Sequence, residues 1–264
     1  MCKTDRENYE KYWDDINPFI KFGCIKDSKF NDKMKDYIIY KNLEDKYVTL
    51  DDYLESAKEK HENQVFYATD EVQQSQYINM FKEEGLDAVI LKHNIDQPFV
   101  TNLEQAKEGV KFSRIDTDLA DIFKEEASEE DTKAIEEDTA KLADIFKKAL
   151  NKESLTVKVE KLKNAEVSSM ITLSEDSRRM QDMMKMYAMP GMDMSMFGGE
   201  GETLILNSNN ELVQFVLNHG DDEHTEIICQ QLYDLALIAH KPLSAEALTK
   251  FVERSNKIMK LLTK

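Results

Sequence analysis

The sequence is poor in cysteine and glycine, and its few cysteines exclude a disulfide framework. Among 264 residues there are 3 cysteines and 8 glycines. Cys2, Cys24 and Cys229 lie far apart and form no CxxC pair, so they predict free thiols in a reducing, cytoplasmic setting. We expect all three to be buried as small apolar side chains.

Long apolar runs and excess positive charge are also absent. No segment approaches the ~20 apolar residues of a membrane-spanning helix, and the first residues, MCKTDRENYEKYW, lack the apolar core of a secretory signal. The 52 Asp and Glu against 35 Lys and Arg give a net charge of −17. This charge disfavours nucleic acid and anionic membranes as partners, so we expect neither.

Signatures of catalysis are missing as well. There is no GxGxxG or GxxxxGK[ST] for phosphates, no GxSxG and no cysteine-protease pattern. The best cluster of ligating side chains is His219–His224 (HGDDEH), but its spacing matches no tetrahedral metal site. Its acidic side chains are favourable at the N-terminus of the following helix, where the helix dipole is positive. A metal-dependent hydrolase using His219 and His224 is therefore a remote alternative, and we expect no metal, cofactor or catalytic residue in this chain.

The first 116 residues show an α/β pattern. Apolar residues at helical spacing predict a helical coil over 1–43, in which Pro18 and Gly23 predict two or three short helices rather than one long helix. A small α/β subdomain follows over 44–116. Its strands are predicted at 64–69, 86–92 and 110–115, a capping box at Thr49 to Asp52, and a helix over 70–84 with Val72, Tyr77, Ile78 and Phe81 facing inward. Strand, helix and strand within about thirty residues predict a parallel βαβ unit.

The segment Asp96–Phe99 follows the second predicted strand. Ligands of open α/β sheets usually bind at this edge. Phe99 is therefore either an exposed apolar contact or the anchor of a loop that packs inward, and the second interpretation is favoured because large aromatic side chains are usually buried.

The remaining residues, 117–264, predict an α+β domain. Within the acidic segment 118–153, apolar residues recur at helical spacing. The alternating segments 154–162 and 167–173 predict an antiparallel hairpin, and 203–207 a third strand. Asn209 or Asn210 is expected to cap the next helix.

The chain ends in a predicted helical hairpin, 222–239 and 244–262. Its first arm is apolar on more than one side, which one neighbouring helix does not cover. Either two hairpins form a four-helix bundle across a two-fold axis, or the apolar side chains that the second arm does not cover pack on the preceding sheet. The residues of the predicted dimer interface are Ile228, Leu232, Leu235, Ala239, Leu248, Phe251, Val252, Ile258 and Leu262.

Methionine is concentrated in one segment. Eight of the 13 methionines fall within 178–197, and Met180, Met183, Met184 and Tyr187 form one helical stripe. Such a stripe is either ordinary core or an exposed surface that adapts to apolar partners. Methionine brings the second interpretation level with the first, because it is flexible and specifies packing weakly.

The order of these segments resembles that of the bacterial heat-shock protein 90 chaperones of the HtpG type, over essentially the whole chain. The resemblance rests on five segments: 9–27 (YEKYWDDINPFIKFGCIKD), 47–54 (YVTLDDYL), 81–91 (FKEEGLDAVIL), 110–116 (VKFSRID) and 232–239 (LYDLALIA). It implies that 1–116 is the distal part of a middle domain and that 117–264 is a C-terminal dimerisation domain.

The resemblance further implies a function. This chain would form a homodimer and bind non-native client proteins, as the part of an ATP-dependent cytoplasmic chaperone that lacks the ATPase domain. ATP and Mg²⁺ would bind to an N-terminal domain that is not in this chain, and the end of the chain lacks the acidic pentapeptide of eukaryotic cytosolic members. Met180 and Met184 match client-contact positions of the family, and Phe99 lies close to another. A dimeric scaffold without client contacts is the alternative.

Overall fold

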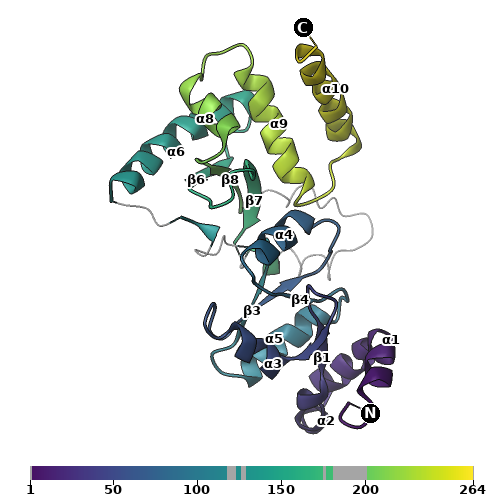
Figure 1. Cartoon of the computed structure of the whole chain (residues 1–264). Helices are drawn as coiled ribbons and strands as arrows, with labels where there is room; N and C mark the ends of the chain where they lie inside the picture. Colours follow the sequence, from purple (N-terminus) through teal and green to yellow (C-terminus); the bar gives the residue numbers. More distant parts are fainter. Residues whose placement is uncertain (1, 118–122, 126–128, 175–176, 181–200, 264) are drawn as a thin grey trace. The chain divides into compact units, whose positions relative to one another are not determined.

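The computed structural model describes residues 2–117, 123–125, 129–174, 177–180 and 201–263. The chain forms two compact units, Met1–Ile115 and Asp116–Lys264, shown in Figure 1. This division lies next to the boundary after residue 116 that the resemblance implies. Each unit has its own apolar core.

Unit 1 begins with a long helix, α1 (Arg6–Lys26), followed by α2 (Ser28–Met34) and a 3₁₀ turn, η1 (Lys35–Tyr37). The prediction that Pro18 and Gly23 divide the first helix is wrong, because α1 is continuous through both. Proline cannot donate to the carbonyl four residues earlier. Here that carbonyl belongs to Asp14, and it accepts a hydrogen bond from Asn17 Nδ2 at 3.1 Å instead.

The α/β part of unit 1 contains two small sheets. Strands β1 (Ile39–Lys41) and β2 (Tyr47–Thr49) are antiparallel. Strands β3 (Gln64–Ala68), β4 (Val89–Ile90) and β5 (Lys111–Arg114) form a parallel sheet in the order β4-β3-β5. The predicted parallel βαβ unit is confirmed.

Helices α3 (Leu50–Ala57), α4 (Ser75–Glu83) and α5 (Asp96–Ala106) complete unit 1. Tyr77, Ile78 and Phe81 of α4 are buried as predicted, but Val72 is 85% exposed. The reason is that α4 begins only at Ser75, so Val72 lies in the preceding turn. Gly85 ends α4 with φ +61°, as expected of a helix C-terminus.

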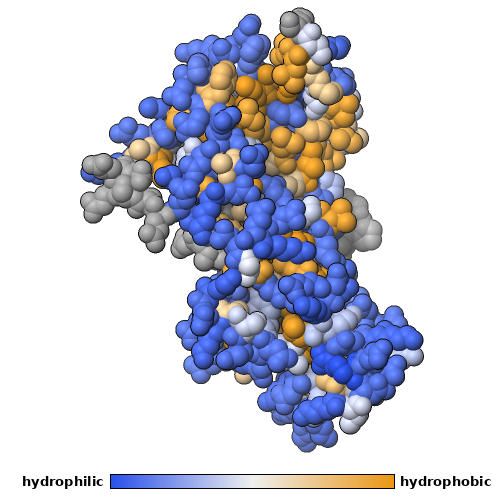
Figure 2. Space-filling model, in the orientation of Figure 1, coloured by the Kyte–Doolittle hydropathy of each residue, from blue (hydrophilic) through white to orange (hydrophobic). Residues whose placement is uncertain are grey.

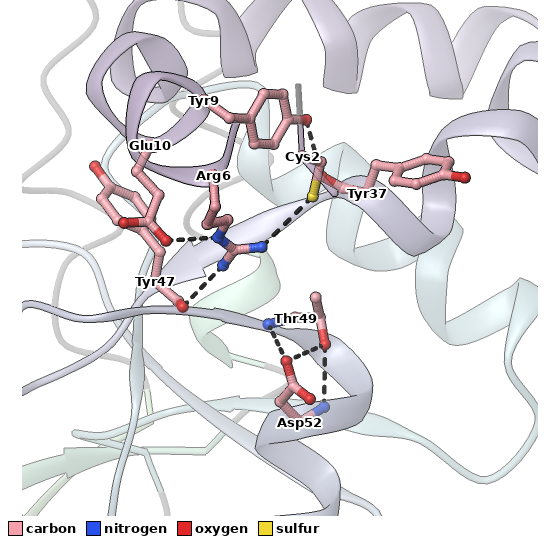
Figure 3. A network of polar contacts seen from close by, with 8 residues as sticks. All are labelled: Cys2, Arg6, Tyr9, Glu10, Tyr37, Tyr47, Thr49 and Asp52. Atoms are coloured by element: carbon pink, nitrogen blue, oxygen red, sulfur yellow. Dashed lines mark hydrogen bonds and ion pairs between the residues drawn. The ribbon is translucent and has the colours of Figure 1, made fainter. Parts of the chain in front are cut away.

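A polar network joins α1 to β2 and to the start of α3 (Figure 3). The Arg6 guanidinium donates to Glu10, to Cys2 Sγ and to the Tyr47 carbonyl. The predicted capping box is confirmed: Thr49 Oγ1 accepts from the Asp52 N–H at 3.1 Å, and Asp52 Oδ2 accepts from the Thr49 N–H at 3.2 Å.

We expect Thr49→Ala to lower the free energy of unfolding by about 1 kcal/mol, because it leaves the Asp52 N–H without its acceptor. Thr49→Ser keeps the hydroxyl and should retain most of the stability. Hydrogen bonds from Thr49 lower the pKa of Asp52, so this contribution is present above the ordinary carboxyl pKa and is lost as the pH falls. Urea unfolding at neutral and acidic pH measures both effects, and equal losses for alanine and serine would contradict the capping role.

Unit 2 combines a three-stranded sheet with helices. In chain order these elements are α6 (Glu129–Leu150), β6 (Thr156–Glu160), β7 (Ser169–Leu173), β8 (Glu202–Asn207), α8 (Glu211–Asn218), α9 (Thr225–Ile238) and α10 (Ala245–Leu261). Asn210 caps α8 by accepting from the Leu212 N–H. The apolar core lies between the sheet and helices α6, α8 and α9.

The predicted hairpin of the first two strands of unit 2 is wrong. The strand order is β6-β8-β7, with β6 parallel and β7 antiparallel to β8. The connection between β6 and β7 is organised by the buried Asn207 at the end of β8. Its Oδ1 accepts from the Leu162 N–H at 3.0 Å, and its Nδ2 donates to the carbonyls of Asn164 and Val167. This side chain therefore binds the connection between β6 and β7 to the end of the central strand, β8.

Candidate protein-interaction surface

The two sides of α9 differ in how they are covered. Thr225, Cys229, Leu232, Tyr233 and Ala236 are buried against the sheet and its helices. The Ser169 hydroxyl of β7 donates to the Leu232 carbonyl at 2.9 Å, which ties this face to the strand. The opposite side of the same helix leaves two large apolar side chains, Leu235 and Ile238, exposed.

Helix α10 packs on α9 through polar contacts. Arg254 forms a half-buried ion pair with Asp234, and its Nε donates to Gln231 Oε1 at 2.9 Å. Gln231 in turn donates to the Ser255 hydroxyl at 3.2 Å. No residue of α10 is buried. In Figure 1, α10 lies beside α9 at the margin of unit 2 and does not cover the sheet.

Helix α10 carries an exposed apolar stripe. Leu248, Val252, Met259 and Leu262 follow i, i+4, i+11 and i+14, the spacing of a helical seam. Together with two residues of α9 they form what we call the hairpin apolar surface, with exposed fractions from 36% for Ile238 to 83% for Leu262. Figure 2 shows hydrophobic residues gathered over α9 and α10. The six residues of the surface are Leu235, Ile238, Leu248, Val252, Met259 and Leu262.

A groove of about 680 Å³ lies on the other side of the two helices, where α6 also lines it. Its lining is mixed: it includes the charged residues Glu226, Lys250 and Arg254 and the apolar residues Leu150 and Ile227. The large exposed apolar side chains of the hairpin gather instead on the hairpin apolar surface. A contiguous apolar surface of this kind is one that another protein covers.

The residues predicted for the dimer interface divide into three groups. Leu235, Leu248, Val252 and Leu262 are exposed. Leu232 is 1% exposed and packs inside unit 2, so its predicted place at an interface is corrected. The predicted dimer interface did not include Ile238 and Met259, although each continues the apolar spacing of its helix. The third group is half-buried and consists of Ile228, Ala239, Phe251 and Ile258.

Only the start of the methionine-rich segment belongs to the described residues. Met180 is 58% exposed at the end of the helical stretch 177–180. Gly201 packs directly against this stretch: its φ is +94°, and a Cβ there would lie 2.3 Å from Ser177 Oγ. Met183, Met184 and Tyr187 lie outside the described residues.

Of the two interpretations of Phe99, the exposed apolar contact is wrong. Residues Asp96 to Phe99 form the first turn of α5 rather than a loop. This turn directs Phe99 into the core of unit 1, where it is fully buried. The correction removes Phe99 from the candidate client contacts.

The histidines and cysteines form no catalytic arrangement among the described residues. His219 stacks on Phe215 with ring centroids 4.5 Å apart, and His224 faces Glu223 at 3.7 Å. No group of three metal-ligating side chains occurs in this part of the chain, and nothing there supports the hydrolase alternative. Burial raises the pKa of the Cys24 thiol to about 11 and that of Cys229 to about 12. Cys2, expected to be buried, is half-exposed.

Comparisons with known proteins decide the family. The model of the Hsp90 protein family matches residues 1–264. The chain belongs to the Hsp90 family. It is 30% identical over 235 residues to the chaperone protein HtpG of Bacteroides fragilis, covering 84% of this chain and 34% of that protein.

Other similar proteins carry names of the same family. HtpG of Porphyromonas gingivalis is 30% identical over 239 residues, covering 86% of this chain and 34% of that protein. The mitochondrial heat shock protein 90-6 of Arabidopsis thaliana is 28% identical over 162 residues, covering 59% and 20%. The resemblance to HtpG-type chaperones is thus confirmed, and the chain spans about a third of the length of its bacterial Hsp90 relatives. Within the described residues, no helix is both long and apolar enough to cross a membrane.

Proposed function

We propose that this chain is the homodimerising and client-binding part of a cytoplasmic Hsp90 chaperone. The observation that carries the proposal is the hairpin apolar surface. Six large apolar side chains are exposed there on two adjacent helices, one of which has no buried residue. A second copy of the hairpin is the simplest partner, because the same stripe on both helices is self-complementary across a two-fold axis.

The geometry of the hairpin supports a four-helix bundle. Helices α9 and α10 are consecutive, and their short connection makes them antiparallel neighbours. Two such pairs facing each other would enclose the seam of Leu248, Val252, Met259 and Leu262. Removing this apolar area from water is the main driving force of such an association. The groove on the other side would remain outside this seam.

Client binding is proposed for the methionine-rich segment. Met180 is exposed although it is unbranched and apolar, and such side chains adapt to apolar partners of different shape. Its position before a further run of methionines supports a binding surface for non-native polypeptides. We place ATP and Mg²⁺ outside this chain and assign it no enzymatic activity.

We expect Met180→Ser to weaken the binding of an unfolded protein by about two- to tenfold, because one apolar side chain is lost from the surface. The free energy of unfolding should stay within about 0.5 kcal/mol, since the residue is exposed. Fluorescence anisotropy with a labelled, reduced and carboxymethylated protein measures the affinity. Val72→Ser, at an exposed apolar residue of unit 1, is the matched control and should bind as the parent chain does.

Two results would contradict client binding at this segment. One is equal affinity of the parent chain and Met180→Ser. The other is unfolding of Met180→Ser, which would identify Met180 as part of a core. A chain that dimerises but binds no unfolded protein would be a structural scaffold.

A further inference from the structure

Helix α1 has an exposed apolar face that the proposed function does not use. Its inner face packs into the core of unit 1 through Tyr9, Trp13 and Cys24. The apolar residues of the exposed face follow i, i+4, i+7 and i+10, the spacing of a helical stripe. Together with one residue of α2 they form what we call the α1 apolar surface, which consists of Tyr12, Ile16, Phe19, Phe22 and Phe30.

This surface is continuous across the two helices. A Cβ at Gly23 would lie 2.9 Å from the Phe30 ring, so the ring of α2 rests on the bare backbone of α1. The exposed fractions run from 36% for Ile16 to 77% for Phe19. Apart from Val72, unit 1 has no other exposed large apolar side chain among its described residues. Apolar side chains concentrated on one face in this way are typical of a surface that another protein covers.

Two charged residues of the same face indicate which protein that is. Asp15 lies three residues after Tyr12, and Lys26 lies four residues after Phe22, so each is a neighbour of the stripe on the helix surface. Both are exposed, and neither side chain forms a hydrogen bond or ion pair within the described part of the chain. Lys26 Nζ lies 5.7 Å from the centre of the Phe22 ring. The stripe therefore has a free carboxylate in its first half and a free ammonium at its end.

This order of charges is complementary to itself in one direction only. Consider two antiparallel copies of α1 that meet at Phe19. Tyr12 and Lys26 are each seven residues from Phe19, so they face each other across the two-fold axis. Asp15 of one copy then lies three residues, or about 4.5 Å along the axis, from the level of Lys26 of the other, within reach of its long side chain. A parallel pair would bring like charges together instead.

We propose that the α1 apolar surface binds the same surface of a second copy of this chain, as an antiparallel helix pair. Each contact occurs twice across the two-fold axis: Ile16 packs on Phe22, and Asp15 pairs with Lys26. One helix face is small for a stable interface, so the contact is weak, with a Kd on the order of 100 µM. It is separate from the hairpin apolar surface, which belongs to unit 2, and it does not rest on the proposed function. A chain that makes both contacts joins hairpin dimers to one another.

The contact is measured by itself in the chain that carries Val252→Glu and Met259→Glu, two substitutions in the apolar stripe of α10 that remove the hairpin contact. Sedimentation equilibrium should show reversible dimerisation of this chain at hundreds of micromolar. Adding Phe19→Ser should weaken that dimerisation at least tenfold, and the fold should persist because the side chain is exposed. Circular dichroism checks the fold. Val72→Ser in the same background is the matched control and should not weaken it.

Charge substitutions then test whether the partner is a second copy. Asp15→Lys or Lys26→Asp alone places like charges at both ends of the helix pair, so each variant should associate several-fold more weakly. An equal mixture of the two variants again places opposite charges at both ends. It should therefore associate about as tightly as the chain without these charge changes.

Three results would overturn the proposal. The first is a hairpin variant that stays monomeric at hundreds of micromolar, and the second is an association that Phe19→Ser leaves unchanged. The third is a mixture of the two charge variants that associates no better than either alone. If Phe19→Ser reduces only the binding of unfolded protein, the surface binds clients rather than a second copy.

Discussion

Replacing both Val252 and Met259 with glutamate should convert the chain from a dimer to a monomer at tens of micromolar. Both side chains are about half exposed in one protomer, so the substitutions should not affect its folding. In the proposed bundle they would bring four carboxylates into an apolar seam. The desolvation and repulsion of these charges should weaken dimerisation by more than about 100-fold.

Sedimentation equilibrium over a range of concentrations measures this effect directly. Leu212→Glu, at an exposed residue of α8 outside the hairpin apolar surface, is the matched control and should remain dimeric. Circular dichroism should show the same secondary structure in both variants. A parent chain that is monomeric at tens of micromolar, or a double variant that dimerises as the parent does, would refute the proposed interface.

Asp96→Ala should destabilise unit 1 by about 3–5 kcal/mol. The substitution leaves the Lys21 ammonium buried, with the rings of Tyr40 and Phe99 as its remaining neighbours. Removing one partner of a buried ion pair costs this much because the other charge is then desolvated without compensation. Urea unfolding followed by the fluorescence of Trp13 reports on unit 1 alone, since the chain has one tryptophan.

The matched control is an exposed ion pair of the same unit. Lys46 and Glu44 contact each other at 2.6 Å, but both side chains are mostly exposed, so Glu44→Ala should leave the unfolding midpoint unchanged. The double variant Lys21→Met/Asp96→Leu removes both charges and should recover most of the stability lost in Asp96→Ala. A double variant less stable than Asp96→Ala would show that packing, rather than the unpaired charge, causes the loss.

Local sequence patterns were sufficient to predict the positions of many elements. The capping box at Thr49, the C-terminal glycine of α4 and the helical hairpin all lie where their residue types predict them. Each depends on residues within a few positions of one another. The continuity of α1 through Pro18 was missed because a rule based on proline alone does not include other donors, and here Asn17 donates to the Asp14 carbonyl that Pro18 cannot bind.

The pairing of β6, β7 and β8 shows where local patterns fail. The two segments before the methionine-rich stretch alternate like the strands of a hairpin, yet the structure inserts β8 between them. The pairing joins residues distant in the chain, and Asn207 binds the carbonyls of Asn164 and Val167 from about 40 residues away. The buried ion pair of Lys21 and Asp96 was missed for the same reason, because the two residues are 75 positions apart.

By itself, the sequence determined where the helices of the terminal hairpin lie and that the first of them is apolar on more than one side. It did not determine which side faces inward. Leu232 and Leu235 are equally apolar and three residues apart, yet only Leu232 is buried, because α9 packs on β7 through the face that contains it. Periodicity describes the shape of one helix, whereas the choice between its faces is made by contacts with residues distant in the chain. Those contacts left Leu235 and the apolar stripe of α10 exposed to solvent.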